Sequence, residues 1–300
     1  MVKGNKGFMT EENIVTTSVS VPTTIEDAFK QKQTLGKAAC YIAGGTLIQL
    51  KREQGTPLPQ HLISLEQIAW MSDIKRLEDS QGYSLMIGVL ASLSICQSHP
   101  TIREEWPLLS EAIQEVASPA VRNRGTIGGN IIYRIGDTIP ALLTLEAKIT
   151  WFDGDYRSEI LWNFLQKNML EDVIITSLSL PSPPIASRTM NFYRKVGRRE
   201  GFIPSLVTVS AYCCWNSDEQ VDYVRLAVGG GANTPKRLER CEQFIIGKKI
   251  SIEILEELYQ KVIEEFFPEP DKFVSTEYQQ TVAANLIVSE LESFLDESIT

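Results

Sequence analysis

The stretch Val121-Arg-Asn-Arg-Gly-Thr-Ile-Gly-Gly-Asn130 decides how the rest of this 300-residue chain is interpreted. Its glycine pair allows successive backbone N–H groups to converge on an anion. Thr126, Asn130 and the nearby Asp137 carry oxygen and nitrogen atoms that can bind ribose hydroxyls. The two arginines of the stretch fit a solvated basic edge equally well, and from the residues alone both interpretations stay open.

A second glycine pair stands in Tyr41-Ile-Ala-Gly-Gly-Thr-Leu-Ile48, directly after an apolar, extended run. No Gly-Lys-Ser/Thr follows it and no Gly-x-Gly-x-x-Gly contains it, so it is neither a P-loop nor the dinucleotide fingerprint of parallel α/β folds. One such pair is often a plain turn. Two in one domain suit a dinucleotide diphosphate held between them.

The composition excludes several classes of function. Lys and Arg number 29 against 38 Asp and Glu, which gives a net charge of −9 and argues against nucleic-acid binding. Only His61 and His99 are available for histidine chemistry. The five cysteines lack any Cys-x-x-Cys spacing, so we expect no disulfide framework, no metal site and no iron-sulfur cluster in this chain.

No apolar signal segment follows Met1, and no run of about 18 apolar residues occurs. We therefore expect a cytoplasmic, soluble protein without membrane contact. The prolines of Pro181-Ser-Pro-Pro184 predict a linker and the main domain boundary.

Hydropathy periodicity predicts alternating strands and helices on both sides of this boundary. A capping box, Thr23-x-x-Glu26, predicts the start of the first helix. Strands are expected at 18–21, 38–43, 61–65, 84–90, 149–152, 156–160 and 173–180, a hairpin at 205–215 and 223–229, and helices at 106–116, 137–147, 252–266 and 277–295.

Two segments after the linker carry weaker signals. Phe192 to Phe202 mixes aromatic and charged residues and could cover a flavin or hold an anionic acceptor, although the pattern alone favours a helix or loop with a charged solvent face. Val224 to Arg237 contains three glycines that we interpret as a sharp exit from a strand.

Taken in order, these segments resemble the FAD-binding (medium) subunit of the molybdenum hydroxylases, the xanthine dehydrogenase family. The resemblance covers about residues 12 to 296. It is carried by Ala43-Gly-Gly-Thr46, Ala117 to Asn130, Asp137-x-x-Pro-Ala-Leu-Leu143 with Leu145-x-Ala147, Tyr193-x-Lys195 with Arg198, Leu226-Ala-Val-Gly-Gly230 with Pro235 and Arg237, and Glu277-Tyr278.

The resemblance implies an α+β fold. A PCMH-type (vanillyl-alcohol-oxidase-like) FAD-binding domain of two α/β subdomains would occupy residues 12–183. A smaller α/β domain of the carbon monoxide dehydrogenase flavoprotein C-terminal type would occupy residues 187–298.

The resemblance also implies noncovalent FAD, with no catalytic side chain and no metal ligand in this chain. The first glycine segment and the second would bind the diphosphate, Asp137 the adenosine ribose region, Ile175 would lie beside the cofactor, Lys195 near the isoalloxazine ring, and Ile203 would pack over the flavin. The implied cofactor-binding residues are Ile42, Ala43, Gly44, Gly45, Thr46, Leu47, Ile48, Thr126, Ile127, Gly128, Gly129, Asn130, Asp137, Ile175 and Lys195.

By the same resemblance, a large subunit would hold molybdopterin and a small subunit the [2Fe-2S] clusters. The FAD of this chain would pass electrons to NAD or another acceptor, in a heterotrimer with a purine substrate. Leu47, where the family usually has Asp, and the short, bulky 131–136 segment motivate a second hypothesis, a scaffold subunit that binds FAD weakly or not at all. A third, a stand-alone flavin oxidase or reductase, has no general base among the motifs to support it.

Overall fold

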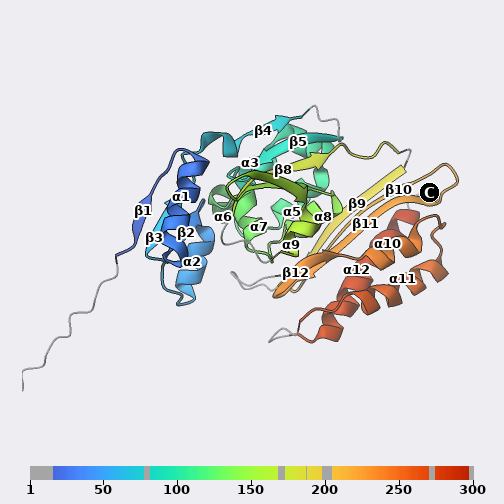
Figure 1. Cartoon of the computed structure of the whole chain (residues 1–300). Helices are drawn as coiled ribbons and strands as arrows, with labels where there is room; N and C mark the ends of the chain where they lie inside the picture. The colour runs from blue at the N-terminus through green and yellow to red at the C-terminus, as the bar shows by residue number, and fades with distance from the viewer. Residues whose placement is uncertain are drawn as a thin grey trace, which may run out of the picture.

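The computed structural model describes residues 16–77, 82–167, 173–186, 188–197, 205–269 and 274–296. Three separate β-sheets follow one another along the chain, and each has helices packed on it (Figure 1). Helices and strands occupy 43% and 29% of the described residues, which confirms the expected α+β class with two α/β subdomains and a third α/β unit.

The first subdomain is a parallel three-stranded sheet in the order β1-β3-β2. Its elements are β1 (Ser18–Ser20), α1 (Ile25–Leu35), the 3₁₀ turn η1 (Gly36–Ala38), β2 (Ala39–Ile42), α2 (Thr46–Glu53) and β3 (His61–Ser64). The capping box expected at Thr23 is wrong by one residue. The hydroxyl of Thr24 accepts from the Asp27 amide at 3.2 Å, because Thr24 has the extended backbone that an N-cap requires.

The second subdomain is an antiparallel sheet in the order β4-β5-β8-β6-β7. The expected hairpin is confirmed by the pairing of Phe152 with Tyr156. Its strands are β4 (Ile74–Arg76), β5 (Tyr83–Gly88), β6 (Lys148–Phe152), β7 (Tyr156–Ile160) and β8 (Ile174–Pro181). The turn η2 (Ala69–Ser72) precedes β4, and the helices are α3 (Leu93–Ser98), α4 (Pro100–Glu105), α5 (Pro107–Gln114), α6 (Pro119–Arg124), α7 (Ile127–Ile132), α8 (Ile139–Thr144) and α9 (Leu161–Leu165).

The third unit is an antiparallel sheet in the order β12-β11-β10-β9, with three helices along one face (Figure 1). The expected hairpin is confirmed, because β10 pairs with β11 in antiparallel fashion. The elements are β9 (Arg188–Val196), β10 (Val207–Trp215), β11 (Val221–Gly230), β12 (Asn233–Arg237), α10 (Glu239–Ile245), α11 (Ile252–Glu265) and α12 (Thr276–Asp296).

The segment expected as a charged helix or loop is instead part of strand β9 up to Val196. Phe192 and Tyr193 are both buried, because β9 pairs with β10 along its whole length and is covered on both faces. The charged residues that follow them, Arg194 and Lys195, gave the segment the composition of an exposed helix or loop. Residues 198–202, and with them Arg198, lie outside the described residues.

Helix α8 joins the two domains. All six of its residues, Ile139 to Thr144, are buried, because one side packs in the first domain and the other on β10, β11 and β12. A helix that is apolar all round is stable only when it is enclosed. The domains therefore share an apolar interface at α8.

Within the described ranges, no helix is long and apolar enough to cross a membrane.

Replacing Leu142 by Ala tests the role of α8. Leu142 is fully buried, so the variant should lose about 2 to 5 kcal/mol of unfolding free energy in denaturant titrations. Ile185→Ala is the matched control, because Ile185 is fully exposed and its truncation should change stability by less than about 0.5 kcal/mol. Equal stability of the two variants would contradict a shared core.

Candidate functional site

A cleft of about 850 Å³ runs from the first subdomain to the third unit. Both glycine segments contribute to its wall. It is lined by Gly44, Gly45, Thr46, Leu47, Gln49, Leu50, Glu53, Leu93, Glu115, Val116, Ala117, Ser118, Val121, Arg124, Gly125, Thr126, Gly129, Asn130, Tyr133, Ile135, Gly136, Asp137, Lys195 and Gly197.

The first glycine segment forms the start of helix α2. Gly45 is its N-cap and has a left-handed backbone with φ of 76°, which a glycine adopts without strain. Among the described residues, the amides of Gly45, Thr46 and Leu47 have no hydrogen-bond acceptor. The cleft therefore contains backbone donors that are free to bind an anion, at the positive end of a helix.

Gly44 brings the two glycine segments into contact. A Cβ atom at this position would lie 1.7 Å from the carbonyl oxygen of Arg124, which is far inside contact distance. On the other side of the contact, Gly125 accepts a hydrogen bond from the Leu93 amide at 2.8 Å. Only a glycine at position 44 permits this arrangement.

The second glycine segment is the short helix α7 and not a free loop, because Thr126 caps it. The Thr126 hydroxyl accepts from the Gly129 amide at 3.1 Å. The Ile127 amide donates to Ala91 at 3.0 Å and the Gly128 amide to Val89 at 2.9 Å. These amides are occupied within the protein.

Gly128 faces the protein interior. A Cβ there would lie 2.6 Å from the Cβ of Val89 and 3.3 Å from Cδ1 of Ile175. Gly128 thus allows α7 to pack on β8, while Gly129 and Asn130 face the cleft.

Asp137 and Lys195 form an ion pair in the wall of the cleft. The Lys195 Nζ atom lies 2.7 Å from Oδ2 of Asp137, and the two side chains are 18% and 15% exposed. Lys195 also donates to the backbone oxygen of Glu115 at 2.7 Å. The Ser205 hydroxyl donates to Oδ1 of Asp137 at 2.8 Å, so both carboxylate oxygens have partners from the third unit.

Tyr193 adds a third bond to the same residue. Its hydroxyl donates to the backbone oxygen of Asp137 at 2.8 Å, and burial together with the Asp137 charge raises its pKa well above the usual value. The phenol therefore stays protonated and remains a donor at all physiological pH values.

The residues expected at the cofactor fall into two groups. Those that line the cleft are Gly44, Gly45, Thr46, Leu47, Thr126, Gly129, Asn130, Asp137 and Lys195. Those that do not are Ile42, Ala43, Ile48, Ile127, Gly128 and Ile175, and the last three are buried. Ile203 lies outside the described residues.

Sequence reasoning missed several lining residues. Glu115 and Val116 end the α5 region, Tyr133 and Ile135 belong to the segment after α7, and Gly197 follows β9. Tyr133 and Ile135 had one signal, since they are the bulky residues where the resemblance leads one to expect small ones.

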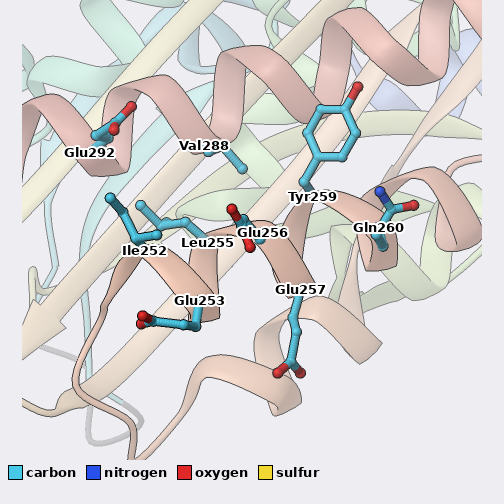
Figure 2. A pocket seen from close by; sticks show the side chains of 9 residues that line it. All are labelled: Ile252, Glu253, Leu255, Glu256, Glu257, Tyr259, Gln260, Val288 and Glu292. Atoms are coloured by element: carbon cyan, nitrogen blue, oxygen red, sulfur yellow. The ribbon is translucent and has the colours of Figure 1, made fainter.

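A second depression, of about 710 Å³, lies between α11 and α12. Figure 2 shows four carboxylates around it, from Glu253, Glu256, Glu257 and Glu292. A diphosphate carries negative charge at neutral pH and is repelled by such a wall. Of the two depressions, the cleft at the glycine segments is therefore the better site for a dinucleotide.

Gly44→Ala tests the contact between the glycine segments. The added methyl group must push Arg124 away, so we expect a loss of about 1 to 3 kcal/mol of unfolding free energy. Gly197→Ala is the control, because its Cβ would meet only Cε of Lys195 at an ordinary 3.7 Å. Thermal or denaturant unfolding measures both, and an unaltered Gly44→Ala protein would refute the contact.

Comparison with known proteins identifies two families in the chain. The FAD binding domain in molybdopterin dehydrogenase matches residues 15–183, and the CO dehydrogenase flavoprotein C-terminal domain matches residues 191–293. The carbon monoxide dehydrogenase medium chain of Hydrogenophaga pseudoflava is 26% identical over 279 residues, covering 91% of this chain and 94% of that protein. A putative xanthine dehydrogenase FAD-binding subunit of Escherichia coli K12 is 24% identical over 245 residues, covering 79% and 82%.

The fold agrees with these matches. A solved carbon monoxide dehydrogenase from Hydrogenophaga pseudoflava, which lacks the Mo-pyranopterin moiety of its molybdenum cofactor, aligns with a TM-score of 0.82 at 24% identity, over 92% of this chain and 96% of that one. The match to the FAD-binding domain alone spans more than half of the length of this chain. The chain therefore belongs to the FAD-binding subunits of the molybdopterin dehydrogenases, which are the flavoprotein components of the oxidoreductases known as molybdenum hydroxylases.

Proposed function

We propose that the cleft holds one FAD noncovalently and that this FAD carries electrons from [2Fe-2S] clusters on a partner subunit to NAD or another acceptor. The observation that carries the proposal is the row of open amides at Gly45, Thr46 and Leu47, which lines the same cleft as the Lys195–Asp137 pair.

The open amides suit the diphosphate. Backbone donors at a helix N-terminus bind phosphate oxygens well, and Arg124 adds a cation to the same cleft. The amides of α7 have partners within the protein, so in this proposal the second glycine segment shapes the site through Gly129, Asn130 and Thr126.

Because Asp137 and Lys195 form an ion pair, both must lie near the same part of a bound FAD. Their charged atoms are 2.7 Å apart, whereas the adenosine ribose and the isoalloxazine ring lie at opposite ends of an extended FAD. We assign the pair to the isoalloxazine end, because a lysine ammonium near a flavin stabilises the negative charge of the reduced ring. FAD supplies the redox chemistry, and the chain supplies binding and electrostatics.

We assign the other redox cofactors of the complex to partner subunits. The five cysteines of this chain lack cluster spacing, so we assign the iron-sulfur clusters to a small subunit and molybdopterin to a large one. Relatives are named as the medium chain or FAD-subunit of a dehydrogenase, which supports a heterotrimer. We propose domains at 12–183 and 187–298, NAD or another electron acceptor, and a purine substrate on the large subunit.

Leu47 favours the alternative, a scaffold subunit with weak FAD binding. This leucine lines the cleft beside the open amides and offers no polar atom to the diphosphate or ribose. The scaffold hypothesis requires that the purified chain bind the two partner subunits and remain colourless when FAD is added.

Titration of the purified chain with FAD separates the two functions. We expect one-to-one binding, with bound-flavin absorption bands. Leu47→Trp should weaken the affinity at least about tenfold, since the indole fills the cleft and a tenfold change corresponds to only about 1.4 kcal/mol. Arg52→Trp, an exposed position on the same helix outside the cleft, should bind FAD as the unmodified chain does. An absence of saturable binding, even with the partners present, would reject the flavoprotein function.

Lys195→Gln tests the isoalloxazine assignment. Removal of the ammonium leaves Asp137 unpaired, so the flavin midpoint potential should fall by about 30 mV, which corresponds to about 1.4 kcal/mol for a two-electron couple. Arg194→Gln is the control on the same strand, because Arg194 pairs with Glu290 of α12 at 2.6 Å, away from the cleft. Spectroelectrochemical titration measures both. Identical potentials for the two variants would move the pair away from the ring.

A further inference from the structure

The connection between α7 and α8 forms one wall of the cleft. It is shorter and bulkier than the resemblance leads one to expect, and it presents Tyr133 and Ile135 to the cleft. Hydrogen bonds and close packing hold this wall in place, so its side chains have fixed positions in the cleft.

Arg134 anchors the middle of this wall. Its backbone has a left-handed φ of 63°, which is uncommon for a residue other than glycine. Its guanidinium donates to the backbone oxygens of Leu165, the last residue of α9, at 2.6 Å and of Lys167 at 3.1 Å. The side chain of Arg134 is thus directed to α9, whereas its neighbours Tyr133 and Ile135 line the cleft.

Asn130 and Gly136 fix the two ends. The Asn130 Oδ1 atom accepts from the backbone amide of Thr138 at 3.1 Å and from its hydroxyl at 2.6 Å. Gly136 packs so closely that a Cβ would lie 2.1 Å from the backbone oxygen of Asn130 and 2.2 Å from its Oδ1 atom. The wall is therefore held at both ends and in the middle, and its aromatic side chain is preorganised.

Tyr133 itself is half-buried, and burial and the nearby Asp137 charge raise its pKa. The phenol is thus neutral at physiological pH. Tyr133 lines the same cleft as Asp137, Lys195 and Gly197. A flat, neutral aromatic ring beside a cation and a carboxylate suits a planar heterocycle, because aromatic rings stack in offset or edge-on geometry.

We propose that Tyr133 is a positioning residue that packs against the isoalloxazine ring and fixes its place in the cleft. The inference rests on the proposed function. The isoalloxazine is preferred to adenine because Lys195 lines the same cleft, and of the two rings only the flavin gains negative charge on reduction.

Binding of FAD, FMN and ADP to three variants tests this. Tyr133→Leu should weaken FAD and FMN binding about tenfold, within the range seen when a stacking aromatic is removed, and leave ADP binding unchanged. It should also raise the fluorescence of bound flavin, since a stacked phenol quenches it. Tyr133→Phe should retain most of the affinity. Tyr156→Leu, at an exposed tyrosine on β7 outside the cleft, is the matched control.

The outcomes separate the two levels of the proposal. If the unmodified chain binds FAD and Tyr133→Leu matches Tyr156→Leu in affinity and fluorescence, the role of Tyr133 is overturned and the FAD site stands. A loss confined to FAD and ADP places adenine at Tyr133 and overturns the isoalloxazine assignment. If the unmodified chain binds no FAD, both the proposed function and this inference fail.

Discussion

At the edge of the cleft, the carboxylate of Asp137 links the two domains. One oxygen receives Lys195 and the other receives Ser205, while its backbone oxygen receives the hydroxyl of Tyr193. All three donors come from the third unit. A largely buried pair of this kind adds little net stability compared with an apolar contact, but loss of one partner is costly because the other charge is left unpaired. The arrangement therefore fixes geometry more than it adds stability.

The apolar helix next to Asp137 supplies the stability that the ion pair does not. Helix α8 begins two residues after Asp137 and is buried on all sides between the two domains. Burial of apolar surface has no preferred direction, whereas hydrogen bonds to a carboxylate do. Together they explain how the third unit comes to contribute Lys195 to a cleft that otherwise belongs to the first domain.

Structural features that depend on residues close together in the sequence could be predicted from it. Hairpins, the final helices and the glycine pair before α2 follow from local periodicity and turn chemistry. The hydrogen bonding of the second glycine segment could not be predicted, because the amides of Ile127 and Gly128 donate to the carbonyls of Ala91 and Val89, far back in the chain. The same holds for β9, whose charged residues conceal a strand that is buried only because β10 lies beside it.

The acidity of the chain as a whole does not oppose binding of an anionic cofactor. At physiological ionic strength, exposed charges more than about 8 Å apart are largely screened from each other. A diphosphate in the cleft is therefore governed by its immediate surroundings, where the open amides, the N-terminus of α2 and Arg124 attract it. The four glutamates between α11 and α12 line a separate depression. The net charge of −9 thus describes the chain as a whole, while binding of a diphosphate depends on the donors that lie beside it in the cleft.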